Sequence, residues 1–183
     1  MTRKLILPSG FLALITDTVG FIQDLPTALI AAFRSTLEEV KEADMLLHIV
    51  DMSNPDYFHH EKTVNKLLDD LGVKDIPQLT VYNKKDIAHA DFVPTADTPT
   101  AFISAYNKED RQELKEKFEK MIIDLMTPYV VLVPSNEGKL LSQLKNETIL
   151  RELSFDETSQ LYRCRGFSLQ DQQITGQLQK YQM

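Results

Sequence analysis

Four consecutive residues near the start of the chain have the types that could hold a metal-bound phosphate. They are Asp17, Thr18, Val19 and Gly20. The Asp17 carboxylate can bind Mg²⁺ or one of its waters, because hard divalent cations prefer oxygen ligands. Gly20 has no side chain, so its backbone N–H can approach a terminal phosphate closely. We therefore expect Asp17 to serve as a metal residue, and this segment to contact the phosphates of a nucleotide.

A second motif, Asn83-Lys84-Lys85-Asp86, has the chemistry to recognise one particular base. The Asp86 carboxylate can accept hydrogen bonds from both the ring N–H and the exocyclic amine of guanine, and adenine offers no such donor pair. Asn83 ties the loop together and meets the purine edge, while the Lys84 stem lies across the ring plane. The motif predicts guanine specificity, carried by Asp86.

A third motif, Ser104-Ala105, can present backbone N–H groups to the guanine keto oxygen, with Tyr106 in the same turn. Each motif is common by itself, and three turns on unrelated loops are the alternative interpretation. Their placement favours one site, because each follows an apolar run (11–16, 79–82 and 100–103). In an open α/β sheet the ligand crevice lies at the carboxyl ends of the strands. The set predicts a GTPase site that binds GTP and Mg²⁺.

Apolar runs and helical periodicity alternate along the first two thirds of the chain. This alternation predicts an α/β fold with a largely parallel sheet, preceded by a hairpin. The expected strands are Lys4–Leu7, Phe11–Thr16, Met45–Val50, Leu79–Tyr82 and Thr100–Ile103. The expected helices run from Pro26 to about Lys41, from Tyr57 to Leu71, where Gly72 ends the helix, and from Asn107 onward.

Thr127-Pro128 interrupts the last of these helices and predicts a boundary between domains 1–127 and 128–183. The second domain is expected to be a small α+β unit. Its expected strands are 129–133, 149–155 and 160–166, and its expected helices are 136–145 and 169–180.

The composition of the 183 residues, 43% of them hydrophobic, fits a protein with a buried core, and no apolar run approaches membrane-spanning length. The single Cys164 excludes an intrachain disulfide and suggests a buried thiol. Residues 1–128 carry 14 Lys and Arg against 21 Asp and Glu, so we expect no general nucleic-acid surface. The mixed charges from Glu113 to Lys120 indicate a solvated helix face.

Two histidine-containing segments could suggest a metal site. Adjacent residues of a helix point in different directions, which argues against His59-His60-Glu61 as a set of ligands. His48 lies inside an apolar strand, so we expect it to be a core histidine with its hydrogen bonds satisfied.

Several segments resemble the HflX family of the Obg–HflX superfamily. The most specific is Thr16–Pro26, TDTVGFIQDLP, which resembles the switch segment of that family. Ala32–Val40 also resembles it, as do Glu42–Asp44 and Leu46–Asp51. Val131–Gly138, with Leu140–Ser142, resembles its C-terminal domain. The resemblance covers essentially the whole chain. It implies a cytoplasmic GTPase that associates with the large ribosomal subunit and can split ribosomes.

The resemblance also implies parts that these 183 residues do not contain, namely an N-terminal domain, a phosphate loop ending in Gly-Lys-Ser/Thr and the first switch. We therefore expect an incomplete P-loop GTPase (G) domain that lacks its first central strand, between 11–16 and 45–50. The gap could be closed by direct pairing of these neighbours, by another chain's strand or by distortion. Exposed strand edges could then produce a non-native oligomer.

The expected function is that of the C-terminal portion of an HflX-like GTPase, which alone does not bind GTP tightly or hydrolyse it. The alternative is a catalytically inactive module that docks on the ribosome or on a protein partner. Phe21 follows Gly20, where many GTPases have a glutamine that orients the attacking water. Phe21 has no hydrogen-bonding group and cannot take this role, whether or not it packs against the switch helix. The family resemblance therefore implies that a partner, the large ribosomal subunit, stimulates hydrolysis.

Overall fold

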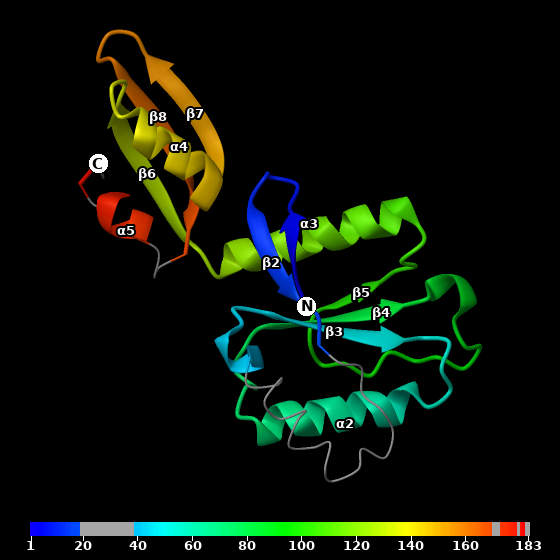
Figure 1. Cartoon of the computed structure of the whole chain (residues 1–183). Coiled ribbons are helices and arrows are strands. Elements are labelled where there is room, and N and C mark those ends of the chain that lie inside the picture. The colour runs from blue at the N-terminus through cyan, green and yellow to red at the C-terminus, as the bar shows by residue number, and fades with distance from the viewer. Residues whose placement is uncertain (19–38, 170–172, 179, 182–183) are drawn as a thin grey trace. The chain divides into compact units, whose positions relative to one another are not determined.

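The computed structural model describes residues 1–18, 39–169, 173–178, 180 and 181 (Figure 1). These residues form two compact units, one of Met1 with Asp17–Leu114 and one of Thr2–Thr16 with Lys115–Met183. The domain boundary at residues 127 and 128 stays a prediction. No helix in the described part of the chain is long and apolar enough to cross a membrane.

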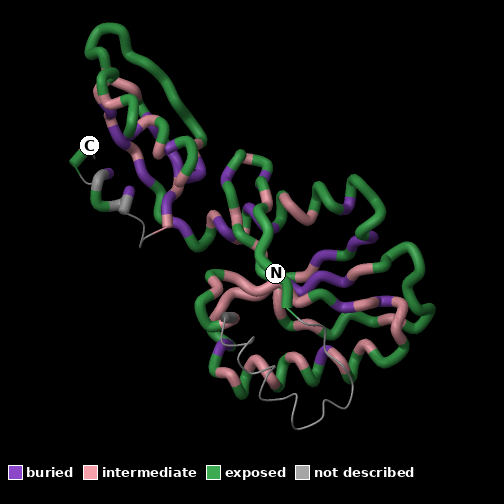
Figure 2. The backbone as a smooth tube through the Cα atoms, in the orientation of Figure 1, coloured by how far each residue is buried: buried purple, intermediate pink, exposed green. Residues whose placement is uncertain are grey.

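The sheet of the first unit contains three parallel strands in the order β3-β4-β5. The central strand β4 is the most buried of them, since Leu79–Tyr82 have no exposed surface (Figure 2). An unbroken apolar run suits a strand that is covered on both faces, and the predicted parallel α/β sheet is confirmed. The bounds are Leu46–Asp51 for β3, Gln78–Asn83 for β4 and Thr100–Phe102 for β5.

Helix α2 (Tyr57–Asp70) ends where the sequence predicts. Gly72 has a φ of +70°, a left-handed conformation that glycine adopts without a steric penalty. Its N–H donates to the Asp69 carbonyl at 3.0 Å, and the Val73 N–H donates to the Leu68 carbonyl at 3.1 Å. These two bonds form a Schellman motif, which satisfies carbonyls that the end of a helix would otherwise leave unpaired.

A buried carboxylate connects α2 to the sheet. Glu61 is 3% exposed and accepts hydrogen bonds from the Tyr82 hydroxyl at 3.1 Å and the Thr95 hydroxyl at 2.8 Å. The Tyr82 oxygen in turn accepts the backbone N–H groups of Thr95 and Ala96, both at 3.0 Å. Glu61 therefore has a structural role, holding the loop after β4 against the sheet.

The prediction that His48 has its hydrogen bonds satisfied is wrong. Its Nδ1 is buried and has no hydrogen-bond partner among the described residues. Burial lowers the pKa of His48 from 6.5 to about 4, because a desolvated imidazole resists protonation. On its face of β3, His48 lies between Leu46 and Val50, and neither side chain offers a hydrogen-bonding group.

This low pKa predicts a pH-dependent loss of stability. Between pH 6.5 and 4 the unfolded chain binds a proton at His48 that the folded chain does not, so stability decreases as the pH decreases. From pH 7 to pH 5, His48 should lower the free energy of unfolding by about 2 kcal/mol. His48→Leu cannot titrate and should lose that much less over the same range. Urea unfolding of both proteins at the two pH values measures the difference, and equal losses would contradict the prediction.

The N-terminal hairpin forms as predicted, with β1 (Thr2–Ile6) antiparallel to β2 (Leu12–Thr16) and Gly10 in the turn at a φ of +88°. Among the described strands, however, β2 pairs only with β1, so direct pairing with β3 is not found. The expected central strand between residues 11–16 and 45–50 stays a prediction.

Strand β3 is consequently the edge of the described parallel sheet. Its residue Ile49 is 54% exposed, although an unbroken apolar run such as residues 45–50 suits a strand that is covered on both faces. Whether another chain pairs with this edge stays a prediction. Most of the helix expected at residues 26–41 falls outside the described residues. At its expected end, Glu39–Glu42 form the 3₁₀ turn η1.

The second unit contains an antiparallel sheet in the order β6-β8-β7, as expected for an α+β unit. Cys164 is fully buried in β8, which confirms the predicted buried thiol. The unit's core consists of Tyr129, Val131, Val133, Leu140, Leu144, Cys164, Ile174 and Leu178. The element bounds are Thr127–Pro134 for β6, Gly138–Glu147 for α4, Ile149–Asp156 for β7, Leu161–Ser168 for β8 and Gln173–Leu178 for α5.

The sequence suggested that the charged residues 113–120 form a solvated face of helix α3 (Lys108–Asp124). One of these residues is buried instead. Glu119 is 4% exposed and binds two other elements of the second unit. Its Oε2 accepts the Ser9 backbone N–H at 2.9 Å, and its Oε1 pairs with Arg151 Nη2 at 3.2 Å. The register of β7 shifts between Leu150 and Glu152, so Arg151 lies in a bulge, a feature that redirects a side chain.

Gly166 of β8 is required by close packing. A side chain there would collide with the Ile149 carbonyl oxygen and lie 2.8 Å from the Tyr129 hydroxyl oxygen. That hydroxyl shares a 2.7 Å hydrogen bond with the Thr148 hydroxyl, so it has little freedom to move.

Replacing Gly166 with alanine should therefore destabilise the second unit. We expect Gly166→Ala to lower the free energy of unfolding by about 2 kcal/mol through overpacking. Gly138→Ala is a matched control, because a side chain at Gly138 meets no atom within 4 Å. It should change stability by less than about 1 kcal/mol. Thermal or urea unfolding of both variants tests this, and equal stabilities would show that β7 and β8 can move apart.

Candidate nucleotide-binding site

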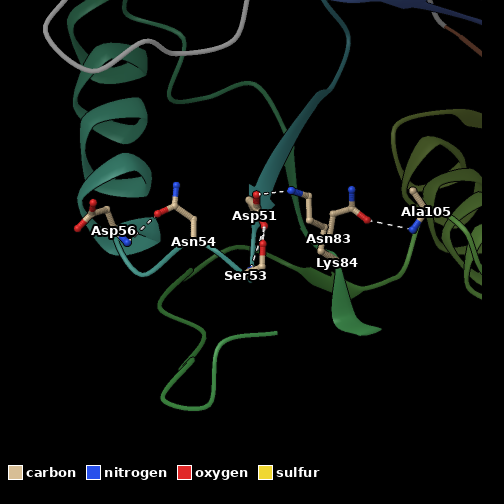
Figure 3. Close-up of polar contacts among 7 residues, drawn as sticks. All are labelled: Asp51, Ser53, Asn54, Asp56, Asn83, Lys84 and Ala105. Atoms are coloured by element: carbon tan, nitrogen blue, oxygen red, sulfur yellow. Dashed lines mark hydrogen bonds and ion pairs between the residues drawn. The ribbon is translucent and has the colours of Figure 1, made fainter. Parts of the chain in front are cut away.

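The carboxyl ends of the three parallel strands carry the polar residues of the candidate site. Asp51 ends β3, Asn83 ends β4, and Ser104 follows β5. Asp51 and Asn83 are register partners, so their loops start side by side. Figure 3 shows these loops with their polar contacts.

A side-chain hydrogen bond joins the two loops predicted to recognise the base. The Ala105 backbone N–H donates to Asn83 Oδ1 at 3.0 Å (Figure 3). The Asn83 carbonyl also accepts the Met52 N–H at 3.0 Å, which ties β4 to the loop after β3. The structure therefore brings Asn83 and Ala105 together as the sequence suggests.

Lys84 has an unusual backbone conformation for a residue with a side chain. Its φ is 66° and its ψ is 39°, in the left-handed region. Two backbone bonds enclose this turn: the Lys85 N–H donates to the Ile103 carbonyl, and the Ile87 N–H to the Lys84 carbonyl, both at 3.0 Å. Strain of this kind persists only where the surroundings hold it, and it is often found at functional sites.

The Lys84 ammonium group pairs with Asp51, a residue to which sequence reasoning assigned no role. Nζ lies 2.7 Å from Asp51 Oδ2, while Ser53 donates its backbone N–H and its hydroxyl to Oδ1 at 2.9 and 2.6 Å. Burial acts to raise the pKa of Asp51, but the hydrogen bonds from Lys84 and Ser53 outweigh it and lower this pKa. The same pair raises the pKa of Lys84. The sequence did contain a signal for this role, because Asp51 is an acidic residue at the end of the strand next to the one that carries Asn83.

A second carboxylate, Asp110 of α3, also contacts these loops, although the sequence pattern did not indicate it. Its Oδ1 pairs with Lys85 Nζ and its Oδ2 accepts the Ser104 N–H, both at 2.7 Å. These bonds lower the pKa of Asp110, the one with Lys85 most. We expected the Ser104 N–H to be presented to a base, but it already donates a hydrogen bond to Asp110. The Ala105 N–H is likewise occupied, by Asn83.

Two predicted base-contacting residues point into solvent. Asp86 is exposed, and no described residue forms a hydrogen bond or ion pair with its carboxylate. Tyr106, in the turn after Ala105, is 92% exposed. Both side chains are thus accessible to a ligand at this edge of the sheet.

The role of Asp17 as a metal residue stays a prediction. Asp17 follows β2 and is exposed, and its backbone exchanges hydrogen bonds with Met1 at 3.0 and 3.1 Å. Thr18 is exposed as well, while Val19 and Gly20 fall outside the described residues. No cluster of three or more potential metal-binding side chains occurs in the ranges that the structure describes.

Comparison with known proteins finds similar sequences and similar folds. The chain is similar to the GTPase HflX of Alkalihalophilus pseudofirmus, with 49% identity over 179 residues, 98% of this chain. The chain belongs to the HflX family. It is also 42% identical over 155 residues to the GTPase HflX of Caldanaerobacter subterraneus and 38% identical over 154 residues to that of Magnetococcus marinus. No family model matches the sequence.

The chain spans less than half the length of these HflX relatives: 42% of the first and 36% of each of the other two. Among solved structures it resembles a glycine-to-serine variant of SsGBP, with a TM-score of 0.56 and 22% identity. That match covers 66% of this chain and 46% of the other. A glycine-to-proline variant of SsGBP gives a TM-score of 0.52 and 20% identity. These structural matches support the fold alone.

The bond between Asn83 and Ala105 can be tested in this HflX-family chain without a ligand. Asn83→Ala removes the acceptor of the Ala105 N–H, so hydrogen exchange at that amide should become about fivefold faster, the equivalent of about 1 kcal/mol. Asp86→Ala in the same loop has no such bond to remove and should leave the exchange rate unchanged. Amide exchange measured by NMR compares the two variants, and an unchanged rate in Asn83→Ala would show that the loops are held by other contacts.

Proposed function

We propose that these residues carry the guanine-recognition part of the nucleotide site of an HflX-type GTPase. The supporting observation is the 3.0 Å hydrogen bond between Ala105 and Asn83, which joins the two base-recognition motifs at one edge of the sheet. The accessible Asp86 carboxylate lies in the same loop as Asn83. A purine site needs these groups to approach the same base, and a shared sheet edge provides that arrangement.

Each residue has a distinct role in the proposed site. Asp86 accepts from the guanine ring N–H and the exocyclic amine, and the Lys84 stem lies across the ring. The Ala105 N–H binds the keto oxygen in place of the Asn83 amide oxygen. Ser104 keeps its bond to Asp110 and so holds the turn rather than the base. Tyr106 borders the site.

The phosphate part of the site is proposed for the complete protein. Asp17, Thr18, Val19 and Gly20 would face Mg²⁺ and the terminal phosphate. One carboxylate suits Mg²⁺, which keeps several waters and phosphate oxygens as its remaining ligands. When bound, Mg²⁺ would neutralise charge that develops on the phosphates during hydrolysis of GTP. These 183 residues contain no Gly-Lys-Ser/Thr loop, so we do not expect them to hold GTP tightly alone.

The family resemblance implies that the partner is the large ribosomal subunit. It also implies that the protein acts in the cytoplasm. The acidic composition of residues 1–128 argues against binding of RNA over a broad surface. We therefore propose that contact with the ribosome is local, and that the ribosome stimulates hydrolysis by the complete protein.

Base choice tests the proposed function in the complete protein. Asp86→Asn should weaken guanine nucleotide binding, because the new amide cannot accept from both guanine donors. It should favour xanthine, whose second keto group can accept from that amide. The preference should shift more than tenfold, about 1.4 kcal/mol.

Calorimetric titration with GDP and with xanthosine diphosphate measures this shift. Asp91→Asn, the same charge change at an exposed residue of the following loop, is the control and should leave both affinities unchanged. Wild-type affinities in Asp86→Asn would remove the basis of the site assignment.

A further inference from the structure

Asp51 occupies a position from which it can control the base-recognition loop without touching the base. It ends β3 in register with Asn83, the first residue of the recognition motif. Its two carboxylate oxygens are used separately, one by Lys84 and the other by the backbone and hydroxyl of Ser53. Ser53 thus fixes the direction of the carboxylate, and the carboxylate fixes the ammonium group (Figure 3).

Lys84 is therefore held at both ends. Its backbone has the left-handed turn that the Ile103 and Ile87 bonds enclose, and its Nζ is fixed by Asp51. A lysine side chain normally loses much rotational freedom when a ligand orders it. Here the four-carbon stem is restrained before any ligand arrives, and a preorganised group binds more tightly than a free one.

We propose that Asp51 is a positioning residue of the guanine site, which holds Lys84 so that its stem can lie against the purine ring. This inference rests on the proposed function, because it requires a purine at this edge of the sheet. The Asp51 carboxylate acts only through Lys84 and makes no contact with the nucleotide.

The exposure of the pair separates this role from a purely structural one. The Lys84 side chain is 46% exposed and that of Asp51 is 38% exposed, so the ion pair contributes little to folding. Breaking it should leave the fold intact and change mainly the freedom of Lys84. Effects on nucleotide affinity should then occur without a comparable loss of stability.

The first experiment uses the 183-residue chain and needs no ligand. NMR titration of the Lys84 side chain should show a pKa above the ordinary value for lysine in the wild type, and a value returned toward it in Asp51→Asn. Asp56→Asn, the same charge change at an exposed aspartate five residues away, should leave it unchanged. If the Lys84 pKa is the same in Asp51→Asn and the wild type, the pair does not exist in solution and the proposal is overturned.

The second experiment uses the complete protein and GDP. Asp51→Ala alone should weaken GDP binding about threefold, as expected for an exposed ion pair. In a protein that already carries Lys84→Met, Asp51→Ala should have no further effect. Additive losses would mean that Asp51 acts independently of Lys84 and would overturn the proposal.

The two proposals fail in different ways. If the wild-type complete protein does not bind GDP, the proposed function is wrong, and this inference falls with it. If the wild type binds GDP and Asp86→Asn changes base choice, but the Asp51 and Lys84 variants are additive, only the positioning role is wrong.

Discussion

Pairing of the central strand β4 on both of its edges is the constraint on which the candidate site depends. Leu79–Tyr82 are completely buried, so their backbone groups must bond to neighbouring strands, and β3 and β5 supply these partners. Because all three strands are parallel, their carboxyl ends reach the same edge. The loops after Asp51, Asn83 and Phe102 therefore begin at the same edge of the sheet.

The two adjacent lysines of the recognition motif hold this convergence in place from opposite sides. Lys84 pairs with Asp51, the last residue of β3. Lys85 pairs with Asp110 in α3, the helix that follows β5. The left-handed backbone at Lys84 accompanies this divergence of consecutive side chains. The exposed Asp86, which follows them, is thereby attached to a loop that is restrained on both sides.

Buried carboxylates play a comparable part away from the candidate site. Glu61 binds the loop after β4 through Tyr82 and Thr95. In the second unit, Glu119 binds the hairpin turn at Ser9 and the bulge at Arg151. A buried charge is tolerated only when it is paired or hydrogen-bonded, so each of these residues makes several elements depend on one another.

The sequence by itself determined the hairpin, the largely parallel sheet, the end of α2 at Gly72 and the placement of Asn83 and Ser104 after buried strands. Apolar periodicity and turn residues are local signals, so they can be interpreted without the fold. Tertiary structure decided the rest: within the described residues His48 has no partner for Nδ1, Glu119 is buried, and Asp51 and Asp110 bind the loops of the candidate site. Partners of two of these residues lie far away in sequence: Lys84 is 33 residues from Asp51, and Ser9 is 110 residues from Glu119. The type of a residue states which bonds it can form, but only the packed chain determines which partner comes within reach.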